Sequence, residues 1–301
     1  LGAGFQESGD LVTNWGDGYN LSYAQSVAWD PLGSGRKDHA AFCGVWFDAT
    51  NLIAYLRVWT VNVRTGEMYN TVDLGTMDWL GSSTLAAYGG NNYFAITAGD
   101  YNGDGKDGLV VYVPGSGSSY GFSYLHLDPN SYQLTRDNTA SQVLLHDTYG
   151  SYELKSSSSK RDRLCVALDS GDVNGDNIDD LVVLSYIQYP SSSAFRSLDT
   201  SLYRPYVAVS LGDKSLEGGG ADIVHKKSGG SGIISTGTMD GKKTVFETMV
   251  SPGLSLGNTD GGARKNIVIA GLQNKIVSKE NNPDKVDDAY SALKSTFDHM
   301  E

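Results

Sequence analysis

The chain has 301 residues, of which 40% are hydrophobic and 19% charged, and its formal net charge is −12 at pH 7. This acidic balance argues against nucleic acid as a general partner, because phosphate binding needs a basic surface. No apolar run is long enough to cross a bilayer, so we expect no membrane insertion. The 37 glycines and 18 tyrosines are typical of many short strands joined by tight turns.

In chain order, a polar loop recurs four times, each time just before a short apolar run. The loop is most complete at 100–108 and 172–180, and weaker at 30–38 and 258–266. The apolar runs that follow are too short and too rich in β-branched residues to favour a helix. They are 40–46, 109–113, 181–184 and 267–270. Strand-like runs also precede the two most complete loops, so we predict a hairpin with the polar loop at its turn.

The loop 172–180 carries oxygen-bearing side chains at alternate positions, as a hard cation such as Ca²⁺ requires. Positions one, three, five and nine supply side-chain oxygens, and position seven supplies a main-chain carbonyl. The predicted calcium ligands of this loop are Asp172, Asn174, Asp176, Ile178 and Asp180. Position twelve is Val183, where an EF-hand needs a bidentate acid, so the EF-hand class is excluded.

The loop 100–108 repeats the pattern with one change. Its predicted ligands are Asp100, Asn102, Asp104, Lys106 through its carbonyl, and Asp107. Gly108 replaces the acid at position nine, and we expect Asp107 beside it to compensate in part. Without metal, such a sequence still makes a good turn, because Asp and Asn cap their own backbone and Gly tolerates positive φ. For the loops 30–38 and 258–266, which lack some of the ligands, this metal-free turn is the favoured interpretation.

The four loops start at residues 30, 100, 172 and 258, which gives intervals of 70, 72 and 86 residues. A recurring period of this size indicates a repeat architecture, with room for four strands in each unit. The D-x-N-G-D-G-x-D type of loop between two apolar strands resembles the FG-GAP and VCBS repeats of integrin α-subunits and bacterial surface proteins.

This resemblance implies an all-β fold over 1–280, built as a β-propeller or an arc of one. Its blades would be four-stranded, with calcium-binding hairpin loops on one face and partners commonly on the other. Such propellers usually have seven blades, which is more than this chain supplies at its own period. A fragment, or a set of blades completed by another chain, therefore stays open as an alternative.

The segment 281–301 has a different character from the repeats. Asn282 and Pro283 suit a helix cap and first turn, and acidic residues follow at the expected N-terminal end. Apolar residues recur at helical spacing, at Val286, Ala289, Tyr290, Leu293 and Phe297. We therefore predict a short amphipathic C-terminal helix.

Polar low-complexity stretches interrupt the repeats and predict surface loops. They lie at 114–119, 156–159, 191–193, 218–220 and 228–231. The two cysteines, Cys43 and Cys165, both fall in predicted strands. Buried free thiols are the favoured interpretation, with a disulfide between them as the alternative.

Motifs for catalysis are few. The five histidines are scattered without a zinc-binding spacing, and no Gly-x-Ser-x-Gly elbow occurs. The leading prediction is an extracellular or cell-surface, calcium-stabilised propeller for adhesion or for binding a protein or carbohydrate ligand, because weak oxygen-ligand sites fill at the higher Ca²⁺ outside cells. One alternative is a carbohydrate-active enzyme, either a polysaccharide lyase or a glycosidase. Another is a structural surface or filament subunit that assembles with copies of itself.

Overall fold

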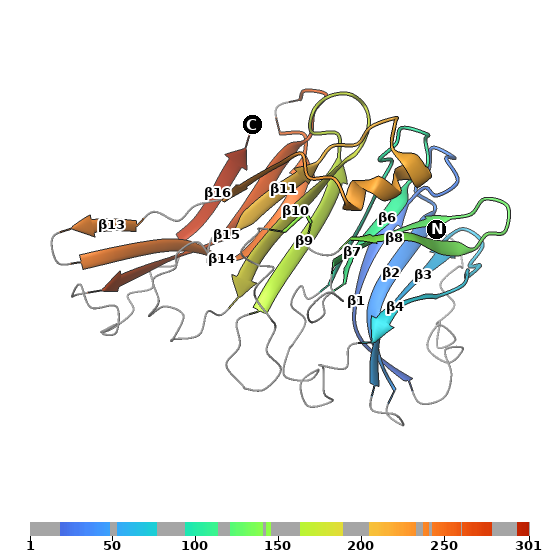
Figure 1. Ribbon diagram of the computed structural model, residues 1–301, viewed down its shortest axis with the longest axis horizontal. Coiled ribbons are helices and arrows are strands. Elements are labelled where there is room, and N and C mark those ends of the chain that lie inside the picture. The colour runs from blue at the N-terminus through green and yellow to red at the C-terminus, as the bar shows by residue number, and fades with distance from the viewer. Residues whose placement is uncertain are drawn as a thin grey trace. The chain divides into compact units, whose positions relative to one another are not determined.

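The computed structural model describes residues 19–48, 53–76, 94–113, 121–140, 143–145, 163–188, 205–232, 237–240, 243–259, 261–278 and 294–300. These residues form four four-stranded antiparallel sheets and one 3-10 helix (Figure 1). Within each sheet the strands are neighbours in the same order as in the sequence. Such a four-stranded meander is the blade of a β-propeller. The predicted fold class of four-stranded blades is therefore confirmed.

Each polar loop joins two adjacent strands of one sheet, as predicted. The first sheet consists of β1 (Tyr19–Trp29), β2 (His39–Asp48), β3 (Ile53–Asn62) and β4 (Val72–Thr76). The second consists of β5 (Ala95–Gly99), β6 (Gly108–Val113), β7 (Gly121–Leu127) and β8 (Leu134–Ala140). The third consists of β9 (Arg163–Gly171), β10 (Asp180–Gln188), β11 (Tyr206–Ser210) and β12 (Gly229–Gly232). The fourth consists of β13 (Gly237–Asp240), β14 (Lys243–Gly257), β15 (Asn266–Ser278) and β16 (Lys294–Met300).

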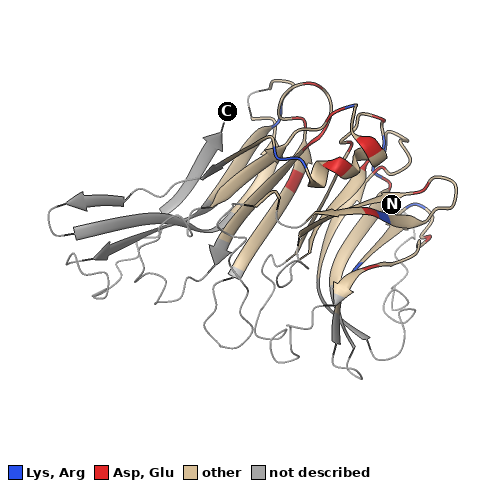
Figure 2. Cartoon of the chain, viewed as in Figure 1, with Lys and Arg blue, Asp and Glu red and all other residues tan. Residues whose placement is uncertain are grey.

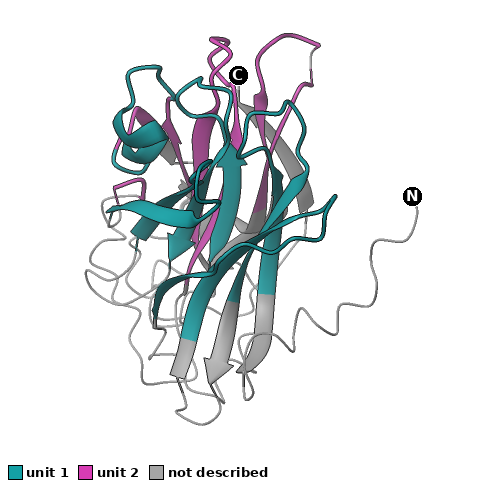
Figure 3. Cartoon of the chain, turned by 90° about the vertical axis from the view of Figure 1, so that its right-hand side faces the viewer, with its two compact units in different colours: residues 1–141, 212–225 teal, residues 142–211, 226–301 magenta. Residues whose placement is uncertain are grey.

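The chain divides into two compact units, coloured separately in Figure 3. The first unit contains residues 1–141 and 212–225, and so holds the first two sheets together with the 3-10 helix η4 (Glu217–Val224). The second unit contains residues 142–211 and 226–301, with the other two sheets. The first unit is therefore discontinuous in sequence, because η4 lies between strands β11 and β12 of the second.

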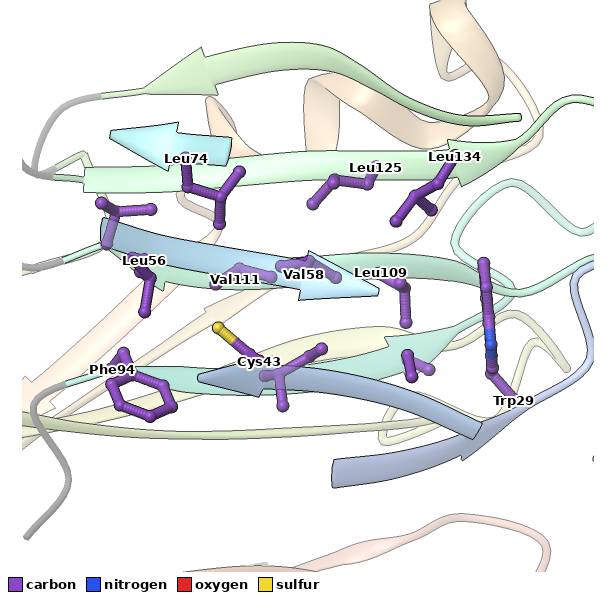
Figure 4. Packing of buried hydrophobic residues seen from close by; sticks show 14 of the residues in the cluster. Trp29, Cys43, Leu56, Val58, Leu74, Phe94, Leu109, Val111, Leu125 and Leu134 are labelled. Atoms are coloured by element: carbon purple, nitrogen blue, oxygen red, sulfur yellow. The ribbon is translucent and has the colours of Figure 1, made fainter. Parts of the chain in front are cut away.

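In the first unit, the core lies between the two sheets (Figure 4). β6 is buried along its whole length, as expected for a β-branched strand covered on both faces. Trp29 is also fully buried, and its indole N–H donates to the hydroxyl of Thr60 at 2.9 Å, which satisfies the polar atom inside the core. Other members of this core are Ala41, Cys43, Leu56, Val58, Leu74, Phe94, Ile96, Leu109, Val111, Leu125 and Leu134.

In the second unit, the described residues form a separate core, contributed by β9, β10, β11 and β15. Its buried members are Cys165, Val182, Leu184, Tyr186, Val207, Ile267 and Ile269. The carboxylate of Asp169 on β9 accepts the main-chain N–H of Leu256 on β14 at 2.7 Å, which ties the two sheets together.

Both Cys43 and Cys165 are buried free thiols, so that interpretation of the cysteines is confirmed.

Two predictions about the loops and the C-terminus differ from the structure. Of the helix predicted over 281–301, residues 281–293 lie outside the described residues, while Lys294–Met300 is strand β16, paired with β15. Pairing with the edge of β15 supplies main-chain hydrogen bonds that a short terminal helix would have to make alone. The predicted surface loops at 218–220 and 228–231 fall instead within η4 and mostly within β12. Among the described residues, no helix is long and apolar enough to cross a membrane.

Candidate metal loops and an adjoining cavity

The four polar loops share a left-handed backbone at position four. Position four is a glycine with positive φ in every loop, namely Gly33, Gly103, Gly175 and Gly261, with φ of 69°, 68°, 89° and 76°. Position six is also left-handed in the first three loops, at Gly35, Gly105 and Asn177. Residues with a side chain rarely adopt this region, so glycine at position four is required by the turn. The repeat therefore extends to the backbone of the two loops that have lost ligands.

In the loop 172–180, the residue at position one holds the turn together. Asp172 Oδ1 accepts the N–H groups of Gly175 at 2.5 Å and Asp176 at 3.2 Å, and its Oδ2 accepts that of Asn177 at 2.8 Å. The side-chain amide of Asn174 donates to Asp176 Oδ2 at 2.9 Å. These contacts close the loop into a compact set of oxygen-bearing side chains.

The remaining predicted ligands of this loop lie closer to the strands. Asp180 is fully buried, and its Oδ2 accepts the N–H of Val173 at 2.9 Å. The side chain of Ile178 is also buried, and its main-chain N–H donates to Asp176 Oδ1 at 2.9 Å. The structure thus brings the predicted side-chain ligands into one hydrogen-bonded loop.

The loop 100–108 is closed by similar contacts. Asp100 accepts the N–H groups of Asp104 at 3.1 Å and Gly105 at 2.9 Å. One end of the Asn102 amide lies 3.1 Å from Asp100 Oδ1 and 3.2 Å from Asp104 Oδ1. With its amide nitrogen at this end, Asn102 donates to both carboxylates. Hard oxygen donors of this kind fit Ca²⁺. Among the described residues, no three His, Cys, Asp or Glu side chains form a metal site by themselves.

The carboxylate of Asp107 contacts the neighbouring loop 30–38. Asp107 Oδ2 accepts the N–H of Asp30 at 2.8 Å and lies 3.6 Å from Lys37 Nζ. Burial raises the pKa of Asp107, while the hydrogen bond from Asp30 and the charge of Lys37 act in the opposite direction. The side chain is only 10% exposed. One oxygen of Asp107 is therefore committed to the contact between loops.

The place of a position-nine side chain in the loop 100–108 is filled by Tyr124. A Cβ on Gly108 would overlap the ring and hydroxyl of Tyr124. That hydroxyl donates to the carbonyl oxygen of Gly219 in η4. Glycine at position 108 is thus required by the packing of a tyrosine from β7.

A cavity of about 460 Å³ adjoins the loop 100–108 in the first unit. Its walls come from the loops around Pro31 and 104–107, from β7 and β8, and from η4. Five carboxylates line it, those of Asp104, Asp107, Asp137, Glu217 and Asp222. Figure 2 shows acidic residues on η4 and on the loops beside it. The apolar part of the lining comes from Pro31, Leu127, Pro129 and Ala221.

The histidine in this cavity is paired. His126 Nδ1 contacts Asp137 Oδ2, which leaves the other ring nitrogen of His126 available to a ligand. Burial raises the pKa of Asp137, and the interaction with His126 partly opposes that effect. Burial, and then the charges of nearby carboxylates, raise the pKa of Tyr124, so its phenol stays protonated.

The wall formed by η4 was not predicted as part of a site. Its sequence, Glu217 followed by three glycines, reads as a flexible linker. Those glycines all have positive φ, and Gly220 packs against Tyr101 and Tyr124. Ile223 and Val224 are fully buried, and the N–H of Asp213 donates to Tyr101 O at 3.0 Å. In the sequence, the only signal of a packed segment here is the apolar pair Ile223–Val224 shortly after the glycine run.

No family model matches the chain, and no curated protein does. Among solved structures, this chain is similar to a glycoside hydrolase family 43 arabinoxylan arabinofuranohydrolase from Bacillus subtilis, in complex with cellotetraose. The sequence identity is 13% and the TM-score is 0.31. That match covers 94% of this chain, which spans 53% of the length of the hydrolase.

Two further solved structures are similar at lower sequence identity. One is the β-propeller domain of the Trilobed protease from Pyrococcus furiosus, at 8% identity and a TM-score of 0.33, covering 94% of this chain and 72% of that one. The other is the WD40 domain of SCAP from fission yeast, at 8% identity and a TM-score of 0.20, covering 92% and 66%. The resemblance to FG-GAP and VCBS repeats stays a prediction from the sequence.

Proposed function

We propose that the protein is an extracellular, calcium-stabilised β-propeller-type domain that binds a carbohydrate ligand in the cavity of its first unit. The observation that carries this proposal is the cavity itself. Its volume of about 460 Å³ lies within the usual range of roughly 300–1,000 Å³ for small-molecule sites. Its polar groups include carboxylates, a histidine, a lysine, a tyrosine and an asparagine, which suit the hydroxyl groups of a sugar.

An exposed tyrosine on the β7–β8 turn supports a carbohydrate ligand. The Tyr132 side chain is 47% exposed and stacks on Tyr69 with ring centroids 6.0 Å apart and an angle of 17° between ring planes. Tyr69 stacks in turn on His39. Tyr132 adopts φ of 53°, an uncommon value for a residue with a side chain, and the turn is fixed by its N–H donating to Asp128 O at 2.8 Å. A rigid, exposed ring of this kind can stack on a sugar.

Calcium has a structural role in this proposal. Bound to the loops 100–108 and 172–180, it would neutralise the gathered carboxylates and stabilise the folded state by mass action. Melting in Ca²⁺ and in EGTA tests this role, with D176N as the variant and D73N as a control outside the loops. We expect EGTA to lower the midpoint of the wild type and of D73N more than that of D176N. An unchanged wild-type midpoint would remove calcium from the proposal.

Binding is tested on a glycan array in Ca²⁺-containing buffer, followed by titration of each positive glycan. Y132A should lose affinity for an extended glycan, whereas Y132F should retain it, because only the ring is needed for stacking. Val63 is exposed to a similar degree, at 49%, so V63A controls for the loss of an exposed apolar side chain. Absence of binding to every glycan would refute the proposed function.

A carbohydrate-active enzyme is the second candidate, favoured by the pair His126 and Asp137. Burial raises the pKa of Asp137, which lies beside His126 and other acids in one cavity. In such an environment one group can act as the proton donor and another as the base. Incubation with neutral and acidic polysaccharides would reveal new reducing ends or unsaturated products. If D137N left any such activity unchanged, this assignment of the pair would be wrong.

A further inference from the structure

The carboxylates of η4 are the least compensated charges of the cavity. Glu217 is exposed and Asp222 partly exposed, and both line the cavity. Within the part of the chain that the structure describes, neither forms a salt bridge. They stand on either side of the glycine run and belong to neither calcium loop. Their charge is therefore available to a ligand whether or not the loop 100–108 holds a metal.

The opposite walls add to this negative charge. Asp104, Asp107 and Asp137 line the same cavity, whereas its basic lining residues are Lys106 and His126. His126 is already in contact with Asp137. The field inside the cavity thus favours a cation.

The rest of the lining distinguishes an organic cation from a metal ion. Among the described residues, Glu217 and Asp222 belong to no group of three His, Cys, Asp or Glu side chains that could hold a metal. Leu127, Pro129 and Ala221 add apolar surface to the same lining. Such a mixture suits a carbon skeleton that carries an ammonium group.

The charged wall is also held in place before a ligand arrives. The hydroxyl of Tyr124 donates to Gly219 O, and buried Ile223 anchors the far end of η4. A Cβ at position 220 would lie 3.1 Å from the Tyr124 hydroxyl, so glycine allows η4 to approach β7 closely. Preorganisation of this kind reduces the cost of ordering the site on binding.

We propose that the cavity selects the ammonium group of an amino sugar, which Glu217 and Asp222 recognise from η4. This inference rests on the proposed carbohydrate-binding function and specifies its ligand class. The amine supplies the positive charge, and the sugar ring supplies the apolar faces and hydroxyl groups that contact the remaining lining.

The test compares two probes of equal length, an oligosaccharide of glucosamine and its fully N-acetylated counterpart, which differ in the charged amine. Titration calorimetry of the full chain in Ca²⁺-containing buffer at low ionic strength measures both. We expect the amine form to bind at least about tenfold more tightly, since hydrogen bonds between charged groups are stronger than those between neutral groups. Raising the salt concentration should reduce this preference, because it screens the carboxylates.

The double variant E217Q/D222N removes both charges while it keeps the shapes of the side chains. It should abolish the preference for the amine form, whereas E67Q, an exposed acid in the turn after β3, should leave it unchanged. Circular dichroism melting confirms that each variant is folded, and the wild-type comparison does not depend on any variant.

The outcomes separate this inference from the function on which it rests. Equal affinity for the two probes, or tighter binding of the acetylated form, would overturn the selection of an amine while leaving carbohydrate binding intact. A preference for the amine form that survives in E217Q/D222N would overturn the role of η4. Absence of binding to every glycan would overturn the proposed function and this inference together.

Discussion

The main-chain N–H of Lys265 donates to the carbonyl oxygen of Asp172 at 2.7 Å, which links the two polar loops of the second unit. In the first unit, the N–H of Asp107 donates to Asp30 O at 2.9 Å. In both cases the donor is at position eight of its loop and the acceptor is at position one of the preceding loop. The repeat therefore includes the contacts between neighbouring loops as well as their conformation. This contact does not depend on the side chain, because position eight is lysine in one unit and aspartate in the other.

The side chain of Asp107 adds a second bond to this link, and its removal should be measurable. D107A leaves the buried N–H of Asp30 without its acceptor, and we expect the unfolding free energy to fall by about 1–2 kcal/mol. D107N keeps an oxygen acceptor and removes a partly buried charge, so it should cost less. Urea denaturation of both variants measures the difference. Equal losses for D107A and D107N would show that charge, rather than the hydrogen bond, is what matters.

The carboxylates of Asp30 and Asp107 should make the folding stability depend on pH in opposite directions. Burial acts to raise the pKa of Asp30, but hydrogen bonds from Ser34, Gly35 and Arg36 outweigh it, and the pKa is lowered from 3.8. The stability contributed by Asp30 is therefore present above pH 3.8 and lost as the pH falls through the lower, folded pKa. The pKa of Asp107 is raised, so its contribution is present below its ordinary pKa and declines as the pH rises through the folded value.

Unfolding free energies measured between pH 2 and pH 6 test both signs. D30N should lose less stability on acidification than the wild type does, and D107N should lose more. The prediction fails if the two variants change the pH profile in the same direction.

Replacement of Gly108 should reveal why this loop lacks an acid at position nine. G108A forces its Cβ against Tyr124, and we expect a loss of about 1–3 kcal/mol from overpacking. In a Y124A background the space is open, so the same replacement should cost much less. A double-mutant cycle by urea denaturation measures the coupling. Purely additive effects would mean that Tyr124 does not determine the residue at 108.

Asn177 offers a way to stabilise the second unit. It has φ of 63°, whereas Gly35 and Gly105 occupy the same loop position elsewhere. N177G should be neutral or stabilising by up to about 1 kcal/mol, and N177V should be destabilising, because β-branched residues avoid positive φ. Thermal melting in EGTA separates this backbone effect from metal binding. A stable N177V variant would contradict the assigned conformation.

The hairpins were predictable because local sequence and tertiary structure agree there. The run 109–113 is β-branched and apolar, and it becomes the buried strand β6; the glycine at position four predicts the left-handed turn before it. The loop residues Asp172 and Asp176 are brought together by hydrogen bonds along a single short segment, so spacing alone predicts their proximity.

The cavity and the C-terminal strand depend on contacts between distant segments. Glu217 and Asp137 line the same cavity because buried Ile223 and the Tyr124 hydroxyl hold η4 against β7 and β8. No local pattern encodes that approach. Phe297 follows a helical spacing in sequence, yet the available edge of β15 determines that Lys294–Met300 is a strand. Tertiary pairing here overrides the local preference.

The position of η4 in the chain has a consequence for synthesis on the ribosome. The first two sheets are complete once residue 140 has been made, but the segment that caps Tyr101 and Tyr124 is translated only after β11 of the other unit. Because chains emerge from the N-terminus, the cavity cannot be assembled until residue 225 has left the exit tunnel. A nascent chain arrested before that point would carry both sheets of the first unit without the η4 wall of the cavity.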